Sequence, residues 1–106
     1  MATLGAPDAL AKEKKVISRT VSGAVLDEAD NGIAGATVQL TDLQTGKKVA
    51  IYSQEEGQYH FSDLQPRHDY EVQASFHGSS SAVRKVSSAD IRNRIVINLT
   101  IPGMKP

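Results

Sequence analysis

The sequence predicts an all-β fold for residues 19–102, a sandwich of two antiparallel sheets built from seven short strands. Three observations predict it. Runs rich in Val, Ile, Thr and Tyr follow Arg19 and are separated every ~8–12 residues by clusters of Gly, Asp, Asn, Ser or Pro. Apolar and polar residues alternate within these runs, which is the period of a strand with one buried face. No convincing amphipathic helix lies between the runs, so the strands must bury their apolar faces against one another.

The length of 106 residues fits one domain that is stable without cross-links. The absence of cysteine excludes a disulfide framework, a thiolate nucleophile and a cysteine zinc site. Residues 1–18 are rich in Ala, Lys and Glu and have no continuing apolar period, so we expect a flexible leader there. Residues 103–106 are expected to form a tail.

The first two strands are predicted over residues 20–27 and 35–43. The turn residues EADNG separate them, and Gly32 is expected to take a positive φ in this turn. Alternation assigns one inward face to each strand. The residues expected to point inward are Val21, Gly23, Val25, Ala36, Val38 and Leu40.

A third strand is predicted over residues 48–53, after a hairpin signal in QTGKK. Its inward face stays unassigned, because both alternating sets carry apolar side chains. The two sets are Val49 with Ile51, and Ala50 with Tyr52.

Four more strands are predicted over residues 58–64, 70–76, 82–88 and 94–101. The strand at 82–88 is expected at a sheet edge, since it is short and charged, and HGSSS before it is expected to be a loop. The residues expected to point inward are Tyr59, Phe61, Leu64, Tyr70, Val72, Ala74, Phe76, Ile95, Ile97, Leu99 and Ile101.

Two segments carry a family pattern, VSGAVLDEADNGIAGATVQLTDLQTGK and EEGQYHFSDLQPRHDYEVQASFHG. From about Arg19 to Ile101 the chain resembles the carboxypeptidase regulatory-like domain, and it is similar to small stand-alone bacterial members. The resemblance implies a transthyretin-like seven-stranded sandwich, with close backbone approach at glycines 23 and 35 and positive φ at glycines 46 and 57. It also implies export to the periplasm or cell surface, with the signal peptide absent from the chain as given.

Charge and hydropathy narrow the range of partners. The 12 Lys and Arg residues balance the 12 Asp and Glu residues, so no net field favours nucleic acid. No apolar run approaches the ~18 residues that a membrane span requires, so no membrane insertion is expected. No cofactor is expected either.

Three histidines, His60, His68 and His77, are candidate metal ligands, since neutral imidazole is a common ligand. Their spacing matches no ligand pattern. We therefore interpret them as solvated surface residues and predict no metal site.

An acidic loop, Asp27–Asn31, offers oxygen donors at close spacing that could hold Ca²⁺. Its candidate ligands are Asp27, Glu28, Asp30 and Asn31. Turn formation by Asp and Asn explains the same residues, and the loop lacks the alternation that would aim them inward. Turn formation is the preferred interpretation, and calcium binding stays open.

Serine chemistry has little support. Ser79, Ser80 and Ser81 follow His77 in a loop, but no GxSxG turn precedes a helix, and no orienting carboxylate or oxyanion hole is recognisable. Asn98 begins a glycosylation acceptor pattern that we attribute to chance.

Two covalent chemistries of related sandwiches are not expected. The chain ends IPGMKP, whereas transthyretin-like purine hydrolases end in a Tyr-Arg-Gly-Ser motif. An internal Lys–Asn cross-link would need an inward Lys on the first strand and a Glu where Ala74 stands.

The sequence thus predicts no catalytic, cofactor-binding or metal-binding residues. The function expected from the resemblance is a non-catalytic module that contacts a protein or a glycan through loops at one end of the sandwich, as a monomer or weak homo-oligomer. The alternatives are a structural or self-associating spacer, or a hydrolase using His60, His77 or the serine loop.

Overall fold

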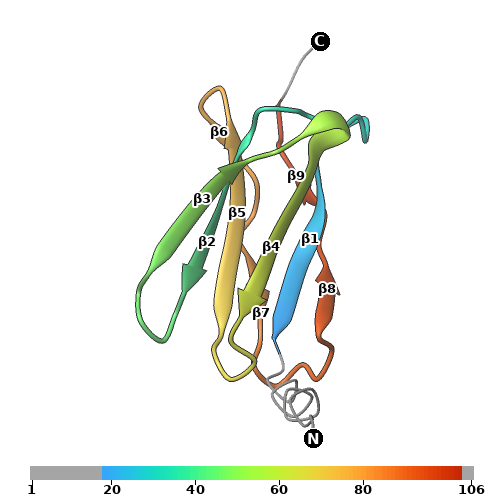
Figure 1. Cartoon of the computed structure of the whole chain (residues 1–106). Coiled ribbons are helices and arrows are strands. Elements are labelled where there is room, and N and C mark those ends of the chain that lie inside the picture. Colours follow the sequence, from blue (N-terminus) through green and yellow to red (C-terminus); the bar gives the residue numbers. More distant parts are fainter. Residues whose placement is uncertain (1–17, 104–106) are drawn as a thin grey trace, which may run out of the picture.

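The computed structural model describes residues 18–103, which form two β-sheets packed face to face (Figure 1). The strands and the single short helix, η1, of this range follow in chain order. They are β1 (Arg19–Leu26), β2 (Thr37–Asp42), β3 (Lys48–Tyr52), η1 (Glu55–Gly57), β4 (Gln58–Leu64), β5 (Tyr70–Phe76), β6 (Ser79–Ser80), β7 (Arg84–Val86), β8 (Arg94–Val96) and β9 (Leu99–Thr100). The predicted leader and tail lie almost wholly outside the described residues.

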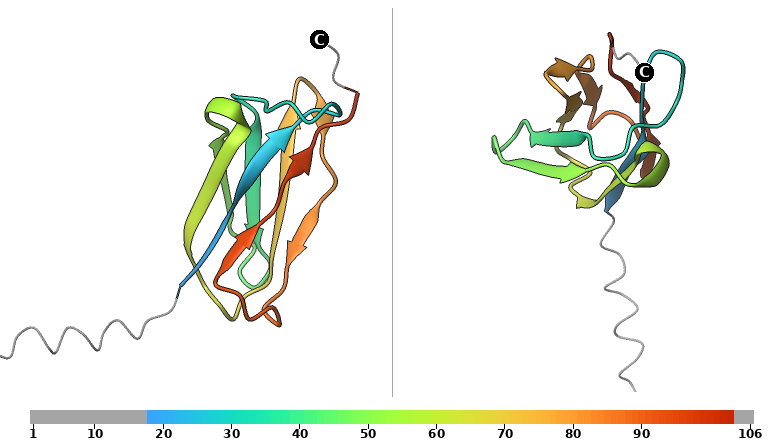
Figure 2. Two further views of the ribbon diagram at one scale, coloured as in Figure 1. Left: turned by 90° about the vertical axis from the view of Figure 1, so that its right-hand side faces the viewer. Right: turned by 90° about the horizontal axis from the view of Figure 1, so that it is seen from above.

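One sheet has the order β4-β1-β8, with β9 also paired to β1, and the other has the order β3-β2-β5-β6, with β7 also paired to β5. In the left view of Figure 2 the sheet that contains β1 lies in front of the other sheet. The all-β sandwich predicted by the alternation is confirmed, and each of the seven predicted strands is present.

Two details differ from the prediction. A two-residue strand, β6, forms in the expected HGSSS loop, because His77 and Gly78 take φ values of 49° and 83° and fold Ser79 back onto Phe76. The predicted last strand is divided into β8 and β9. The side chain of Asn98 interrupts it, since its Oδ1 accepts the Ala24 N–H at 3.1 Å in place of a backbone carbonyl.

The last strands also run in a direction that the antiparallel prediction missed. β8 and β9 pair with β1 in parallel, with Val21 opposite Ile95 and Val25 opposite Leu99. The chain crosses between the sheets after β7 and arrives beside β1 with the same orientation. Parallel pairing requires such a crossover, whereas a tight hairpin would have given an antiparallel pair.

The core lies between the sheets and consists of residues that the alternation assigned to it, together with Ile33 and Val86, which it did not assign. All of the predicted inward side chains are buried except Phe76, which is half-buried and packs against the core. Tyr59 and Phe61 pack edge to face with ring centroids 6.0 Å apart. Burying each large apolar side chain contributes on the order of 2 kcal/mol.

Close packing of the backbone requires glycine at three positions, Gly23, Gly32 and Gly57. A Cβ at Gly23 would lie 1.8 Å from the Ile97 carbonyl oxygen, and one at Gly57 would lie 2.3 Å from the Val25 carbonyl oxygen. Gly57 also has a φ of 78°. The expected close approach at Gly35 is wrong, because a Cβ there would meet nothing within 4 Å, and its φ of 79° explains the glycine instead.

The expected positive φ at Gly32 is also wrong. Asp30 takes the left-handed conformation of this turn, with a φ of 66°. Gly32 lies so close to η1 that a Cβ would come within 2.1 Å of the Glu56 carbonyl oxygen. Glycine is therefore required at position 32 by a steric contact with η1 and not by a positive φ.

Within the described range, no helix is long and apolar enough to cross a membrane.

Candidate functional site

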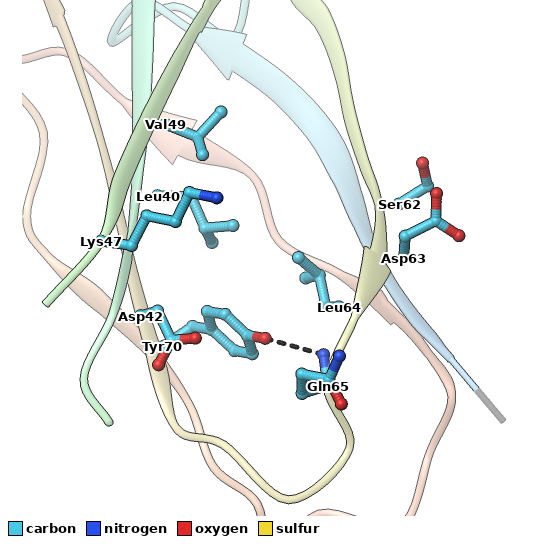
Figure 3. Close-up of a pocket in the computed structure, with 9 residues that line it drawn as sticks. All are labelled: Leu40, Asp42, Lys47, Val49, Ser62, Asp63, Leu64, Gln65 and Tyr70. Carbon is cyan, nitrogen blue, oxygen red and sulfur yellow. Dashed lines mark hydrogen bonds between the residues drawn. The ribbon is translucent and has the colours of Figure 1, made fainter. Parts of the chain in front are cut away.

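A cleft of about 270 Å³ opens between the two sheets on the side where β3 and β4 form their edges (Figure 3). Buried Leu40, Leu64 and Tyr70 form its floor, and exposed Lys47 and Asp63 stand on opposite rims. The complete lining is Leu40, Asp42, Lys47, Val49, Ser62, Asp63, Leu64, Gln65 and Tyr70.

The floor of the cleft is fixed by Tyr70 at the start of β5. Its hydroxyl accepts a hydrogen bond from the Gln65 backbone N–H at 2.7 Å, across the turn that joins β4 to β5 (Figure 3). Burial is the main cause that raises the pKa of the Tyr70 hydroxyl. The hydroxyl is therefore a structural hydrogen-bonding group and stays neutral at physiological pH.

Asp42 and His68 form a polar pair at the end of the cleft. His68 Nδ1 lies 2.8 Å from Asp42 Oδ2, and Asp42 Oδ1 accepts the N–H groups of Gln44 and Thr45 at 2.8 and 3.3 Å. Partial burial raises the pKa of Asp42, but the bonds from His68 and the two backbone groups outweigh it and lower that pKa. This carboxylate closes the β2–β3 hairpin and binds His68 to it.

The three histidines do not converge. His60 is exposed on β4, His68 is held by Asp42, and His77 stacks on Phe76 with ring centroids 4.0 Å apart. No group of three His, Cys, Asp or Glu side chains that could hold a metal occurs among residues 18–103.

The acidic loop closes on itself. Asp27 Oδ1 accepts the N–H groups of Ala29 and Asn31 at 2.8 and 2.9 Å. These bonds, chiefly the one from Asn31, lower the Asp27 pKa. Glu28 and Asp30 are exposed. The geometry supports turn formation, with the Asp27 carboxylate as its centre.

The serine loop is engaged in structure as well. Ser81 is buried; its Oγ accepts the Ala74 N–H and donates to the Ala82 carbonyl oxygen, both at 3.0 Å. No histidine or carboxylate of the described range bonds to it. Ser79 and Ser80 belong to β6, which continues the sheet beside β5.

The residues considered for a Lys–Asn cross-link are not arranged for one. Lys47, Lys48 and Lys85, the lysines that the described range contains, are all exposed. Ala74 is fully buried in β5.

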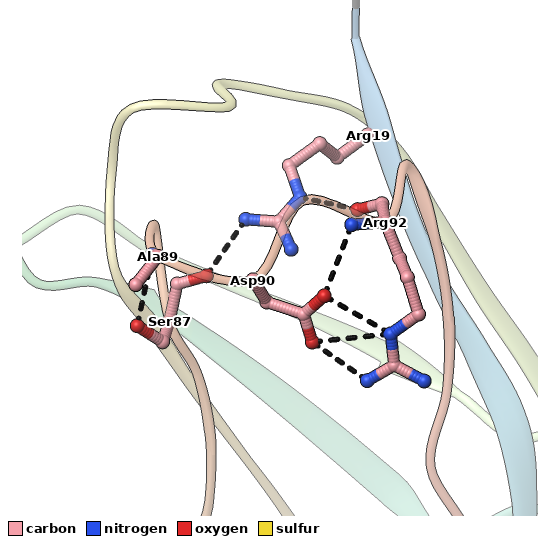
Figure 4. A network of polar contacts seen from close by, with 5 residues as sticks. All are labelled: Arg19, Ser87, Ala89, Asp90 and Arg92. Carbon is pink, nitrogen blue, oxygen red and sulfur yellow. Dashed lines mark hydrogen bonds and ion pairs between the residues drawn. The ribbon is translucent and has the colours of Figure 1, made fainter.

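A buried arginine was missed by the sequence analysis. Arg19 is 1% exposed; its Nε donates to the Arg92 carbonyl oxygen at 3.2 Å and its Nη1 to the Ser87 carbonyl oxygen at 3.1 Å (Figure 4). The Arg92 guanidinium in turn lies 2.6 Å from the Asp90 carboxylate. The side-chain hydrogen bond between these two groups is the main cause that lowers the Asp90 pKa. Alternation could have predicted this burial, because Arg19 lies on the same face of β1 as the inward residues Val21 and Val25.

The second candidate feature is the outer edge of β3, which borders the cleft. In the part of the chain that the structure describes, β3 pairs with β2 alone and its other edge is uncovered. Val49 is 42% exposed and Tyr52 is 68% exposed, whereas Ile51 packs against the core. This settles the face that the sequence left unassigned: Ile51 points inward, and the strand presents Tyr52 to solvent.

The hydrogen bonds of the β2–β3 hairpin show which backbone groups of β3 are unpaired. The Asp42 N–H bonds the Lys47 carbonyl oxygen and the Ser53 N–H bonds the Ala36 carbonyl oxygen, both at 2.8 Å. The bonding direction alternates along an antiparallel strand. The backbone N–H and C=O groups of the odd-numbered residues of β3, which are in phase with Lys47 and Ser53, therefore point toward β2. The N–H and C=O groups of Lys48, Ala50 and Tyr52 therefore point outward.

Comparison with known proteins agrees with this fold. A family model described as Carboxypeptidase regulatory-like domain matches residues 20–101. No curated protein matches the sequence.

Several solved structures are similar in fold. BcpA*(D312A), the major pilin subunit of Bacillus cereus, has a TM-score of 0.62 at 17% identity, over 80% of this chain and 30% of the pilin. 3-Chlorocatechol 1,2-dioxygenase from Rhodococcus opacus 1CP has a TM-score of 0.62 at 9% identity, over 81% of this chain and 60% of the enzyme.

The dioxygenase domain of a dioxygenase carbohydrate-binding protein fusion from Streptomyces sp. SirexAA-E has a TM-score of 0.58 at 11% identity, over 81% of this chain and 80% of that chain. The chain thus spans less than two thirds of the pilin and of the chlorocatechol enzyme. At these identities the similarity shows the fold alone.

Proposed function

Since the family model covers residues 20–101, this chain belongs to the carboxypeptidase regulatory-like family, and on that premise we propose that it is a non-catalytic, exported module that binds a protein strand along the edge of β3. The observation that carries the proposal is the row of outward backbone groups at Lys48, Ala50 and Tyr52, flanked by exposed apolar surface. An uncovered edge of this kind is a template for an added strand.

A non-catalytic role is supported by how the polar side chains are used. Ser53 Oγ donates to the Ile33 carbonyl oxygen at 2.6 Å and accepts the Ala36 N–H at 2.9 Å, so it closes a turn. Ser81 and the Asp42–His68 pair are engaged in the same way. An active site would instead leave a nucleophile or base free to face a substrate.

A protein partner fits the edge better than a glycan. Backbone amides spaced along a strand match those of another extended polypeptide. Within the cleft the aromatic ring of Tyr70 is only 4% exposed, so it offers no open face on which a sugar ring could stack.

Export is supported by the pilin, which shares this sandwich.

Site-specific photo-cross-linking tests the proposal in cells that make the chain. A photoreactive phenylalanine replaces Tyr52, at the β3 edge, or His60, which is exposed on β4. We expect a defined protein adduct at position 52 that is absent at position 60 and is lost when Ala50→Pro is added. Equal adducts at both positions, or none at position 52, would refute strand addition at this edge.

A further inference from the structure

The β3 edge is complementary to itself. We propose that its partner is a second copy of this chain, paired β3 to β3 in antiparallel orientation about a two-fold axis at Ala50. This inference rests on the proposed function, because it names the partner of the same edge. It makes the module a symmetric dimer with one continuous sheet across both copies.

The outward backbone groups fit this symmetry. They belong to Lys48, Ala50 and Tyr52, which are spaced evenly about Ala50. A two-fold axis there places Ala50 opposite its own copy and Lys48 opposite Tyr52 of the second copy. Each facing pair then exchanges both of its N–H···O bonds. Among residues 18–103, the Tyr52 carbonyl oxygen receives only a long 3.4 Å bond from the exposed Gln54 side chain, which a second strand would displace.

The side chains fit the same register. Lys48 would lie over the ring of Tyr52 from the second copy, an ammonium against an aromatic face, and this pair occurs twice. On the other face, Val49 would lie opposite Ile51 of the second copy. Val49 and Tyr52, now 42% and 68% exposed, would both lose contact with water.

Two other strands at sheet edges, β4 and β7, are less suited to a second strand. β4 is longer, but its pairing with β1 shifts register opposite Arg19–Val21, and Asp63 takes a φ of 58° there, so a bulge and a charge interrupt the edge. β7 has three residues and presents Arg84 and Lys85 to solvent. β3 continues its register with β2 without a break from Lys48 to Tyr52.

Single-cysteine variants test the axis directly, since the chain has no cysteine of its own. Facing residues of a hydrogen-bonded pair have Cα atoms about 5.5 Å apart, within disulfide reach, whereas the two copies of Lys48 would lie about 14 Å apart. We expect Ala50→Cys to form a disulfide dimer at least about tenfold faster than Lys48→Cys under mild oxidation. Ser62→Cys, exposed on β4, gives the collision rate. Equal rates for the three variants would overturn the register.

A charge exchange tests the pairing without a covalent bond. Sedimentation of the full chain is measured over a wide range of concentration. Tyr52→Lys places two ammonium groups opposite each other and should abolish the rise of the sedimentation coefficient with concentration. Adding Lys48→Glu places a carboxylate opposite the new ammonium group and should restore it.

The outcomes also separate this inference from the proposed function. A chain that stays monomeric at every concentration, yet still gives a heterologous adduct at position 52, overturns the self-pairing and leaves strand addition standing. Absence of both association and adduct refutes both. A homodimeric adduct at position 52 supports both.

Discussion

The Tyr70 hydroxyl accepts the Gln65 backbone N–H at 2.7 Å, and this bond joins the start of β5 to the end of β4 across the corner of the sandwich. β4 and β5 belong to different sheets, so the bond fixes how the two layers meet at the floor of the cleft. A phenyl ring would fill the same space but would leave a partly buried N–H group without a partner.

We therefore expect Tyr70→Phe to lower the free energy of unfolding by about 1–2 kcal/mol, the usual cost of an unsatisfied buried donor. Urea titration measures it. Tyr52→Phe is the matched control, since the Tyr52 side chain is exposed, and it should change stability by less than about 0.5 kcal/mol. Equal effects of the two substitutions would mean that the corner bond contributes nothing.

Alkaline stability should depend on Tyr59. Its hydroxyl donates to the Ile97 carbonyl oxygen at 2.7 Å, and burial raises its pKa well above the ordinary 10.0. Stabilisation from a raised pKa is complete below the unfolded value and is lost as the pH rises above it. The free energy of unfolding should therefore fall above about pH 10, and less steeply in Tyr59→Phe. Parallel pH profiles for the two proteins would contradict this.

Acid stability should depend on Asp42. Its lowered pKa means that its contribution is present above the ordinary 3.8 and is lost as the pH falls through the folded value. We expect the urea midpoint to drop between neutral pH and about pH 3, and to drop less in Asp42→Asn. Asp63→Asn is the control, because the Asp63 side chain is exposed and accepts no hydrogen bond from the described residues.

Two glycines distinguish steric from conformational requirements. Gly46→Ala should cost about 1–2 kcal/mol, because its φ of 80° is strained for alanine although a Cβ meets nothing within 4 Å. Gly57→Ala should cost about 3 kcal/mol or more, because its φ is similar and a Cβ would lie 2.3 Å from the Val25 carbonyl oxygen. Thermal or urea unfolding of both variants measures the difference. Equal losses of stability would show that β1 moves away from the added Cβ at position 57 without a measurable loss of free energy.

The β3 edge offers a matched proline pair. Ala50→Pro removes an N–H that points outward, so it should leave the fold nearly unchanged while blocking any added strand. Val49→Pro removes an N–H that faces β2, so it should cost about 3 kcal/mol. Urea unfolding and sedimentation are measured on both. A large loss of stability in Ala50→Pro would show that the two sets of groups are assigned the wrong way round.

Alternation predicted most of the fold because a strand with one buried face leaves a clear pattern. It placed Val21, Val38 and Val72 inward, and all three are fully buried. It could not reveal the direction of β8, because a strand reads the same whether its neighbour is parallel or antiparallel. That depends on the crossover after β7.

The candidate site was harder to predict than the core, because alternation is a weaker guide at the edge of a sheet. A strand at the edge of a sheet is covered on few sides, so the alternation weakens: Val49 is partly exposed although Ile51, in the same set, packs against the core. The cleft depends on how far the β3 and β4 edges stand apart, which no local pattern encodes. The burial of Arg19 was missed because arginine is usually a surface residue. Its burial depends on the carbonyl oxygens of Ser87 and Arg92, which are about 70 residues away in the sequence.

The parallel pairing of β1 with β9 has a mechanical consequence. β1 begins with Arg19 at one end of the sandwich, and β9, which Ile101 follows, ends at the opposite end (Figure 1). Tension applied to these two points would draw β1 and β9 past each other along their length. The bonds between them would then bear the load together in shear, instead of opening one after another, so the sandwich is built to resist stretching along its long axis.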